Sequence, residues 1–140
     1  MKSLDFSRLS DFIDKKWDDS ALPSLCEFIE IPALSPSFDS DWEENGYLDA
    51  AIETFISWVK SLPLERASVS VHRLRGRSPV LLVTIDGDAE GEILFYSHLD
   101  KQPEATGWSE GKGPWKPVIE DNWLYGRGSV DDGYGGYAGV

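Results

Sequence analysis

The sequence predicts an α/β fold in which a mixed sheet is flanked by helices. Apolar residues recur at helical spacing between residues 6 and 62, and runs rich in β-branched and aromatic residues follow between residues 67 and 98. The chain has 140 residues, 41% of them hydrophobic, which is enough for one domain with a core.

Three amphipathic helices account for the first half of the chain. The first covers residues 6–17 and the second residues 22–29, and a short polar break at residues 18–20 separates them. The third helix begins at Tyr47, presents a continuous apolar face and ends before Pro63.

Three β-strands are expected after the helices. The runs "ASVSVHRL", "PVLLVTID" and "EILFYSH" are β-rich, and the connections "RGRS" and "GDAEG" have the composition of turns. The apolar stretches at residues 80–85 and 93–96 are nearly continuous, so both strands are expected to be covered on two faces. His72 lies in the more polar first strand and is expected to be exposed or at an edge. Two short extended pieces then flank a turn at residues 120–122, and the Gly-rich end begins a helix.

The charge of the chain excludes several classes of partner. Its formal net charge of −12 would repel nucleic acid and anionic lipid surfaces. The N-terminal residues have neither the apolar core of a signal peptide nor the length of a membrane span. Cys26 is the single cysteine, so it forms no intrachain disulfide, and it is expected to be a small core residue. These features favour a cytoplasmic protein.

His98 and Asp100 lie where the third expected strand gives way to a polar loop. Residues two apart point to the same face of a strand, and ligands of open α/β sheets collect at this end. One use of such a pair is a metal site in which the imidazole binds the ion and the carboxylate orients it. The other is a structural hydrogen-bonded pair that needs no metal.

A second candidate feature is the adjacent pair Asp131 and Asp132, which lies among glycines. Two neighbouring carboxylates repel each other, and a divalent cation would relieve that repulsion. Alternatively, one of them caps the helix that begins in "GYGGYAGV". Taken alone, this pair leaves both interpretations open.

Together these segments resemble peptidase family M20, a family of zinc exopeptidases that includes carboxypeptidases, dipeptidases and a desuccinylase. The resemblance runs through "LFYSHLDKQP", "GWSEGKGPWKPVIEDNWLYGRG" and "SVDDGYGGYAG" in the family's order and spacing, with "LCEFIEIPALSP" as a weaker upstream match. It implies a zinc-dependent metallopeptidase that hydrolyses the amide bond of a dipeptide or N-acyl amino acid. It also implies two zinc ions per full-length active site.

The resemblance assigns roles to individual residues. It makes His98 a zinc ligand, Asp100 the catalytic residue that orients His98, and Asp131 the bridge between two zinc ions, with a cis peptide bond between Asp131 and Asp132. Many members follow the Asp pair with Lys-Gly. Here residues 133–135 are Gly-Tyr-Gly, which resembles a dipeptidase-like subgroup.

The same resemblance implies that residues 1–140 are a partial catalytic domain. In the family, the general base, the other zinc ligands and a lid or dimerisation domain lie beyond the position that corresponds to Val140. We therefore expect an N-terminal fragment that is inactive alone. The resemblance is compatible with a homodimer of the full-length protein. The alternative is a stand-alone, non-catalytic binding domain derived from a peptidase fold.

Overall fold

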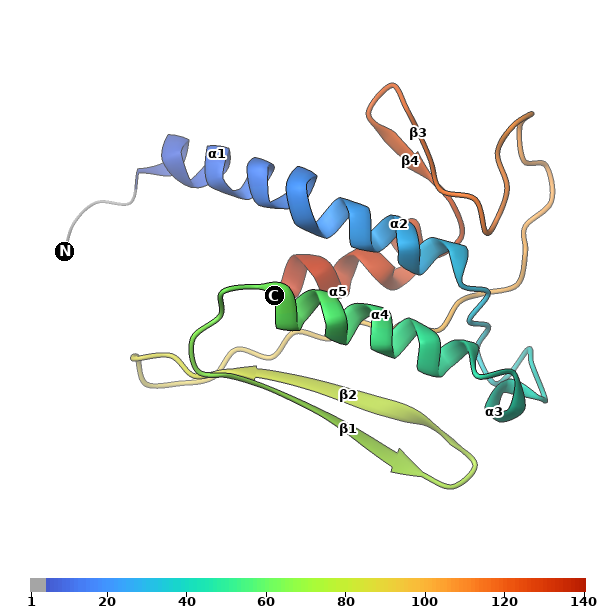
Figure 1. Ribbon diagram of the computed structural model, residues 1–140, viewed down its shortest axis with the longest axis horizontal. Coiled ribbons are helices and arrows are strands. Elements are labelled where there is room, and N and C mark those ends of the chain that lie inside the picture. The colour runs from blue at the N-terminus through green and yellow to red at the C-terminus, as the bar shows by residue number, and fades with distance from the viewer. Residues whose placement is uncertain (1–4) are drawn as a thin grey trace.

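The computed structural model describes residues 5–140. A long helical segment, a second long helix and a short C-terminal helix pack together, and a long β-hairpin lies along the second helix (Figure 1). The helical elements are α1 (Phe6–Lys16), η1 (Trp17–Ala21), α2 (Leu22–Glu30), α3 (Trp42–Asn45), α4 (Tyr47–Ser61), η2 (Ser129–Gly133) and α5 (Tyr134–Gly139). The strands are β1 (Ala67–Leu74), β2 (Arg77–Ile85), β3 (Val118–Glu120) and β4 (Trp123–Tyr125).

The first two expected helices form one continuous helical segment, so the predicted break is wrong. The residues that join α1, η1 and α2 keep right-handed helical dihedrals, and η1 is a turn of π-helix. Pro23 has no N–H to donate to the preceding turn, and a wider turn directly before it accommodates the missing bond. Lys15 and Asp19 also form an ion pair of 2.6 Å across the expected break.

The core lies between α2, α4 and α5. Phe28 and Ile29 of α2 are fully buried, and the apolar face predicted for α4 is buried along the helix. Tyr137 of α5 packs against the rings of Phe55 and Trp58, with ring centroids 5.1 and 4.6 Å away. These aromatic contacts hold the C-terminal helix against the helices formed by the first half of the chain.

The β1–β2 hairpin confirms two of the expected strands but not their burial. The strands pair antiparallel from Ala67↔Ile85 onward, and side chains on one face, such as Val69 and Val83, pack against the core. Val80 and Leu82 alternate with them and are exposed. The expectation that residues 80–85 are covered on both faces is therefore wrong, because only one face of the hairpin meets a helix layer.

The third expected strand does not form. Residues 92–98 have no regular secondary structure, and Leu94 and Tyr96 are 91% and 84% exposed. A strand requires hydrogen bonds to a neighbouring backbone, and neither the β1–β2 hairpin nor the β3–β4 hairpin pairs with this segment. The α/β class is confirmed, but the strands form two separate antiparallel pairs, and parallel pairing among residues 5–140 is limited to one bridge, Leu34↔Lys101.

The C-terminal elements agree with the sequence. β3 and β4 form a short hairpin whose turn residues Asp121 and Asn122 have φ values of 52° and 63°. Asp and Asn tolerate this left-handed region better than most residues, which explains the tight two-residue turn. The Gly-rich end forms α5, as expected.

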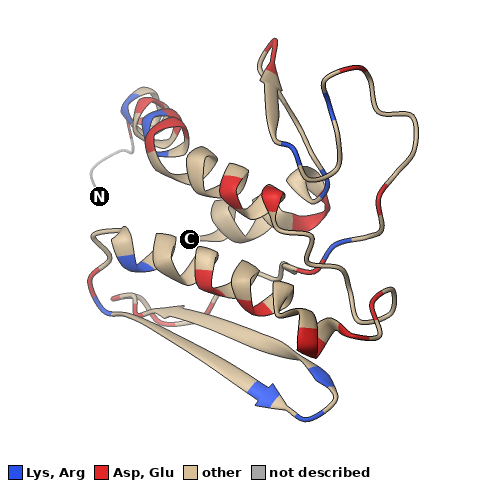
Figure 2. Cartoon of the chain, turned by 45° about the vertical axis from the view of Figure 1, so that its right-hand side comes forward, with Lys and Arg blue, Asp and Glu red and all other residues tan. Residues whose placement is uncertain are grey.

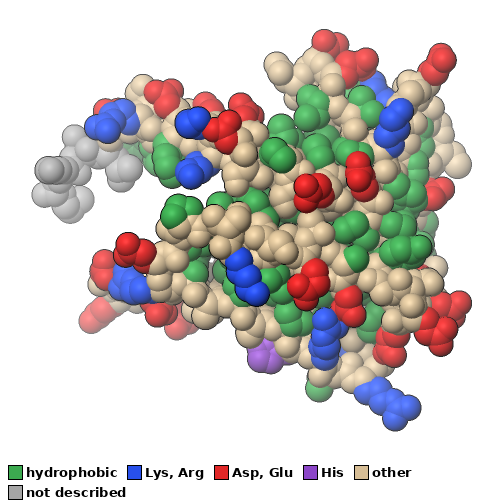
Figure 3. All heavy atoms as spheres, in the orientation of Figure 1, with side chains coloured by type: hydrophobic (Ala, Val, Ile, Leu, Met, Phe, Trp, Pro, Cys, Tyr) green, Lys and Arg blue, Asp and Glu red, His purple; other side chains and the backbone are tan. Residues whose placement is uncertain are grey.

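Charged residues are unevenly distributed over the fold. Acidic residues spread over the helices and loops, whereas the residues at the turn end of the β1–β2 hairpin are basic (Figure 2). In the space-filling view, α1 projects from the body of the molecule with a hollow beside it (Figure 3). Among residues 5–140, no helix is both long and apolar enough to cross a membrane.

Candidate metal centre

The segment that carries His98 and Asp100 is anchored at Lys101. The Lys101 N–H donates to the Ala33 carbonyl at 2.8 Å, and the Ser35 N–H donates to the Lys101 carbonyl at 2.9 Å. These bonds attach the segment to the loop that follows α2. They replace the strand pairing that was expected to hold His98 and Asp100.

His98 and Asp100 contact each other, as the two-residue spacing predicted. His98 Nδ1 lies 2.9 Å from the Asp100 carbonyl oxygen and 3.1 Å from Asp100 Oδ1. A carbonyl oxygen can only accept, so Nδ1 carries the proton and donates. In the neutral imidazole, Nε2 therefore presents a lone pair, which is the state that a metal ligand requires.

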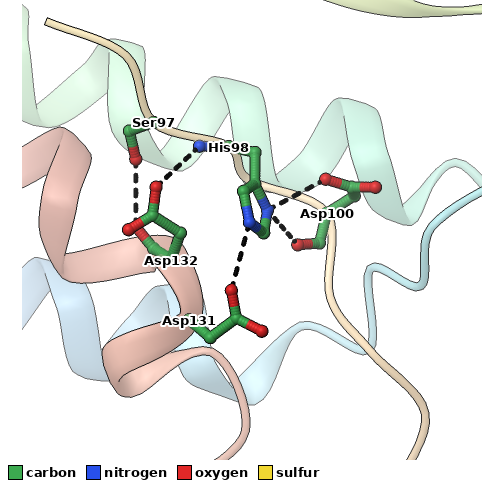
Figure 4. Close-up of polar contacts among 5 residues, drawn as sticks. All are labelled: Ser97, His98, Asp100, Asp131 and Asp132. Atoms are coloured by element: carbon green, nitrogen blue, oxygen red, sulfur yellow. Dashed lines mark hydrogen bonds and ion pairs between the residues drawn. The ribbon is translucent and has the colours of Figure 1, made fainter.

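The lone-pair side of His98 faces Asp131. Nε2 lies 3.2 Å from Asp131 Oδ1, and Figure 4 shows the imidazole between the two carboxylates. A lone pair and a carboxylate oxygen repel at this distance unless a proton or a metal ion lies between them. Zinc–nitrogen and zinc–oxygen bonds of about 2.0–2.2 Å at a tetrahedral angle place two ligand atoms roughly 3.4 Å apart. The pair therefore fits one shared ion.

Asp132 connects the turn that carries Asp131 to the segment that carries His98 by two hydrogen bonds. Its carbonyl oxygen accepts from Ser97 Oγ at 2.9 Å, and its Oδ2 accepts from the His98 backbone N–H at 3.3 Å (Figure 4). The Asp131–Asp132 peptide bond is cis, in agreement with the resemblance. Neither residue of the acidic pair was assigned these bonds from the sequence, because nothing in the local pattern of Asp132 indicates a bond to residues 97 and 98.

The glycines around the acidic pair make this close approach possible. A Cβ atom on Gly133 would lie 2.4 Å from Phe28 Cε1 and 2.5 Å from the Gly128 carbonyl oxygen. A Cβ on Gly135 would lie 2.8 Å from Asp132 Oδ1. The first helical residues of α5 receive no side-chain cap, so neither carboxylate has the capping role that the sequence left open.

The electrostatics of the site centre on His98. Burial disfavours the imidazolium and by itself lowers the pKa of His98, but the hydrogen bond to Asp100 and the negative charges of Asp100, Asp131 and Asp132 outweigh it and raise the pKa. The His98 and Asp100 side chains are 31% and 29% exposed, and Asp131 is 62% exposed. Solvent and small solutes can therefore reach the side of the imidazole that faces Asp131.

Other candidate ligands lie elsewhere. His72 is exposed on β1, as expected, with Nε2 3.1 Å from Ser70 Oγ. Cys26 is half-buried on α2, and burial, followed by the charges of Glu30 and Glu27, raises the pKa of its thiol. Within residues 5–140, no group of three or more His, Cys, Asp and Glu side chains is arranged to hold a metal ion. The described chain thus offers two ligands, not a complete set.

Comparisons with known proteins find related sequences. Residues 94–140 match the family described as Peptidase family M20/M25/M40. An uncharacterised metallohydrolase of Methanocaldococcus jannaschii is 26% identical over 118 residues, which are 81% of this chain and 28% of that protein. A succinyl-diaminopimelate desuccinylase of Zymomonas mobilis is 36% identical over 73 residues, which are 49% of this chain and 19% of that protein. The chain spans less than a third of the length of either relative.

Proposed function

We propose that this chain, whose residues 94–140 match peptidase family M20/M25/M40, contributes to a zinc-dependent hydrolase. The proposed reaction is hydrolysis of the amide bond of a dipeptide or an N-acyl amino acid. The observation that carries the proposal is the geometry of His98, whose Nδ1 is held by Asp100 while Nε2 faces Asp131 Oδ1 at 3.2 Å.

Each residue of the site has a proposed role. His98 Nε2 and the Asp131 carboxylate would hold zinc, and Asp131 would be the ligand common to both ions of the full-length site. Asp100 keeps the proton on His98 Nδ1 and fixes the plane of the ring. Bound zinc supplies Lewis-acid polarisation of the scissile carbonyl and acidifies a bound water.

One of the relatives and the exposure of the site support the proposed substrate class. A desuccinylase among the relatives acts on a succinylated amino acid, which is an N-acyl amino acid. The exposed side of Asp131 leaves room for a small solute, and the net charge of −12 does not favour nucleic acid or anionic membranes. The proposed location is the cytoplasm, and the proposed substrate is a small peptide or N-acyl amino acid. The proposed full-length form is a homodimer.

Residues 1–140 are proposed to be part of a catalytic domain. Catalytic zinc sites use three protein ligands and an open position, and the hydrolytic step needs a general base. His98 and Asp131 supply two ligands, and within residues 5–140 no group of three or more His, Cys, Asp and Glu side chains is arranged to hold a metal ion. The remaining ligands, the base and a lid or dimerisation domain are assigned to chain beyond these residues.

Zinc titration of the 140-residue chain tests the metal site. We expect weak binding by calorimetry, which His98→Ala abolishes and His72→Ala leaves unchanged. Asp100→Ala is expected to weaken it by about 10- to 100-fold, as loss of a ligand-orienting carboxylate does elsewhere. Equal binding by wild type and His98→Ala would contradict the site and favour the non-catalytic binding domain.

Hydrolysis assays test whether the 140-residue chain is sufficient for catalysis. The purified 140-residue chain is expected to be inactive toward dipeptides and N-acyl amino acids with zinc present. Expression of the whole reading frame that contains it is expected to give chelator-sensitive hydrolysis. If the 140-residue chain itself hydrolyses these substrates, and His98→Ala and a chelator both abolish the activity, the partial-domain proposal is wrong.

A further inference from the structure

Lys101 is a buried lysine beside the candidate metal centre. It is 1% exposed, and its Nζ donates to the carbonyls of Phe28, Ile29 and Ile31 at 2.6, 3.2 and 2.6 Å. These carbonyls belong to the C-terminal end of α2 and the residue that follows it. Among residues 5–140, no carboxylate forms a salt bridge with Nζ.

The carbonyls at the end of α2 compensate for the burial of this charge. Burial lowers the pKa of Lys101 to about 7, because the charged form loses its hydration. In the opposite direction, the last carbonyls of a helix carry partial negative charge, and three of them use all three donors of an ammonium group. The Phe28 ring adds a cation–π contact, with Nζ 4.0 Å from the centroid.

The stem of the same side chain contacts the turn that carries Asp131. A Cβ atom on Gly128 would lie 2.9 Å from Lys101 Cε, so this glycine leaves room for the lysine stem. The Gly128 carbonyl accepts from the Gly133 N–H at 2.9 Å and closes the turn around the acidic pair. Lys101 therefore touches the end of α2 and the Gly-rich turn, and its own backbone continues the segment that carries His98.

We propose that Lys101 is a positioning residue that holds His98 and Asp131 face to face before a metal ion binds. Only two residues separate His98 from Lys101, so fixing Lys101 restricts where the imidazole can lie. Packing of Gly128 on the lysine stem restricts the other ligand in the same way. This role rests on the proposed metal site, but the arrangement of the two side chains can be tested without metal.

The test compares Lys101→Met with the wild-type chain. Methionine keeps most of the length of the stem and removes all three donors. Lys15→Met is the matched control, because Lys15 is an exposed lysine on α1, with a side chain that is 77% exposed. Circular dichroism at the working temperature establishes that each variant is folded before any other measurement.

The first readout is the ¹⁵N chemical shift of the His98 ring nitrogens in metal-free protein, with His72 as internal reference. The wild type and Lys15→Met are expected to show the Nδ1–H form, and Lys101→Met is expected to show averaging of the two tautomers. A merely structural role would lower the unfolding temperature and leave these shifts unchanged in the folded protein. Unchanged shifts in folded Lys101→Met would overturn the proposal.

The second readout is zinc affinity by calorimetry. Lys101→Met is expected to bind at least 10-fold more weakly than the wild type, and Lys15→Met as well as the wild type. If the wild type binds no zinc but the His98 shifts still move in Lys101→Met, the proposed function fails and the positioning role stands. If zinc binds equally to all three proteins, the positioning role fails and the metal site stands.

Lys101→Arg provides the comparison if the methionine variant does not fold. It keeps a cation and several donors, but its planar guanidinium cannot direct one atom at three carbonyls. The expected shift of the His98 signals is smaller than for methionine and in the same direction. A folded arginine variant with wild-type shifts and wild-type affinity would overturn the proposal.

Discussion

α1 and α2 are two parts of one continuous helical segment, and they differ completely in burial. Both are amphipathic, yet no residue of α1 is buried, whereas α2 buries Ser24, Leu25, Phe28 and Ile29. Phe12 of α1 is 58% exposed and Phe28 of α2 is fully buried. The α2 half meets α4 and the Gly-rich turn, and the α1 half projects beyond them (Figures 1 and 3). An apolar helix face therefore predicts a helix, but burial depends on what packs against it.

The largest expected effect comes from truncating Phe28, with Phe12 as its exposed counterpart. Phe28→Ala removes a fully buried ring, so we expect a loss of about 3–5 kcal/mol in the free energy of unfolding. Phe12→Ala is the matched control and is expected to change it by less than about 0.5 kcal/mol. Urea denaturation of both variants checks the difference. Similar losses in both would show that α1 is covered in solution.

A second prediction concerns the turn that packs on α2. Gly133→Ala places a methyl group against Phe28 and the Gly128 carbonyl, where there is no room, and we expect a loss of about 1–3 kcal/mol. Gly87→Ala is the control, because no atom lies within 4 Å of its added Cβ. Equal stability of the two variants by urea denaturation would mean that the turn does not pack against α2 as described.

A third prediction uses pH to examine the contact between α2 and α5. Tyr137 OH lies 3.0 Å from Ser24 Oγ, and burial raises the pKa of Tyr137 to about 12 despite the opposing effect of that hydrogen bond. The unfolded tyrosine ionises near pH 10, so the stability that this shift contributes is present below pH 10 and is lost between pH 10 and 12.

The check compares the wild type with Tyr137→Phe by urea denaturation at pH 9 and 11. The advantage of the wild type is expected to shrink by on the order of 1 kcal/mol over this interval, because only the wild type carries the ionisable group. Other alkaline titrations occur in both proteins and cancel in the difference. A constant difference across the interval would indicate that Tyr137 is solvated.

The smallest effect is expected in the extended segment before the site. Leu94 is 91% exposed, so Leu94→Ser should change the free energy of unfolding by less than about 0.5 kcal/mol. Such a small change would show that this segment, like α1, is an apolar stretch that no other part of the molecule covers. A loss of 2 kcal/mol or more in urea denaturation would instead show that another surface covers the segment in solution.

Local patterns in the sequence predicted the local features of the molecule. Helical periodicity predicted the buried face of α4, β-rich runs predicted β1 and β2, and turn residues predicted the β3–β4 hairpin. The two-residue spacing of His98 and Asp100 predicted their contact, although the strand expected to carry them is absent. The resemblance to family M20 indicated Asp131, which no spacing could connect to a residue 33 positions earlier.

Contacts between distant segments determined the rest. The exposure of residues 93–96 depends on whether a second backbone lies beside them. In the first helical segment, Ser20 Oγ accepts a hydrogen bond of 3.0 Å from Trp58 Nε1, a contact between residues 38 positions apart. The bonds of Lys101 to carbonyls about 70 residues earlier have no local signature at all. Side-chain periodicity reports the conformation of one segment, whereas burial, metal geometry and charge compensation depend on which segments meet.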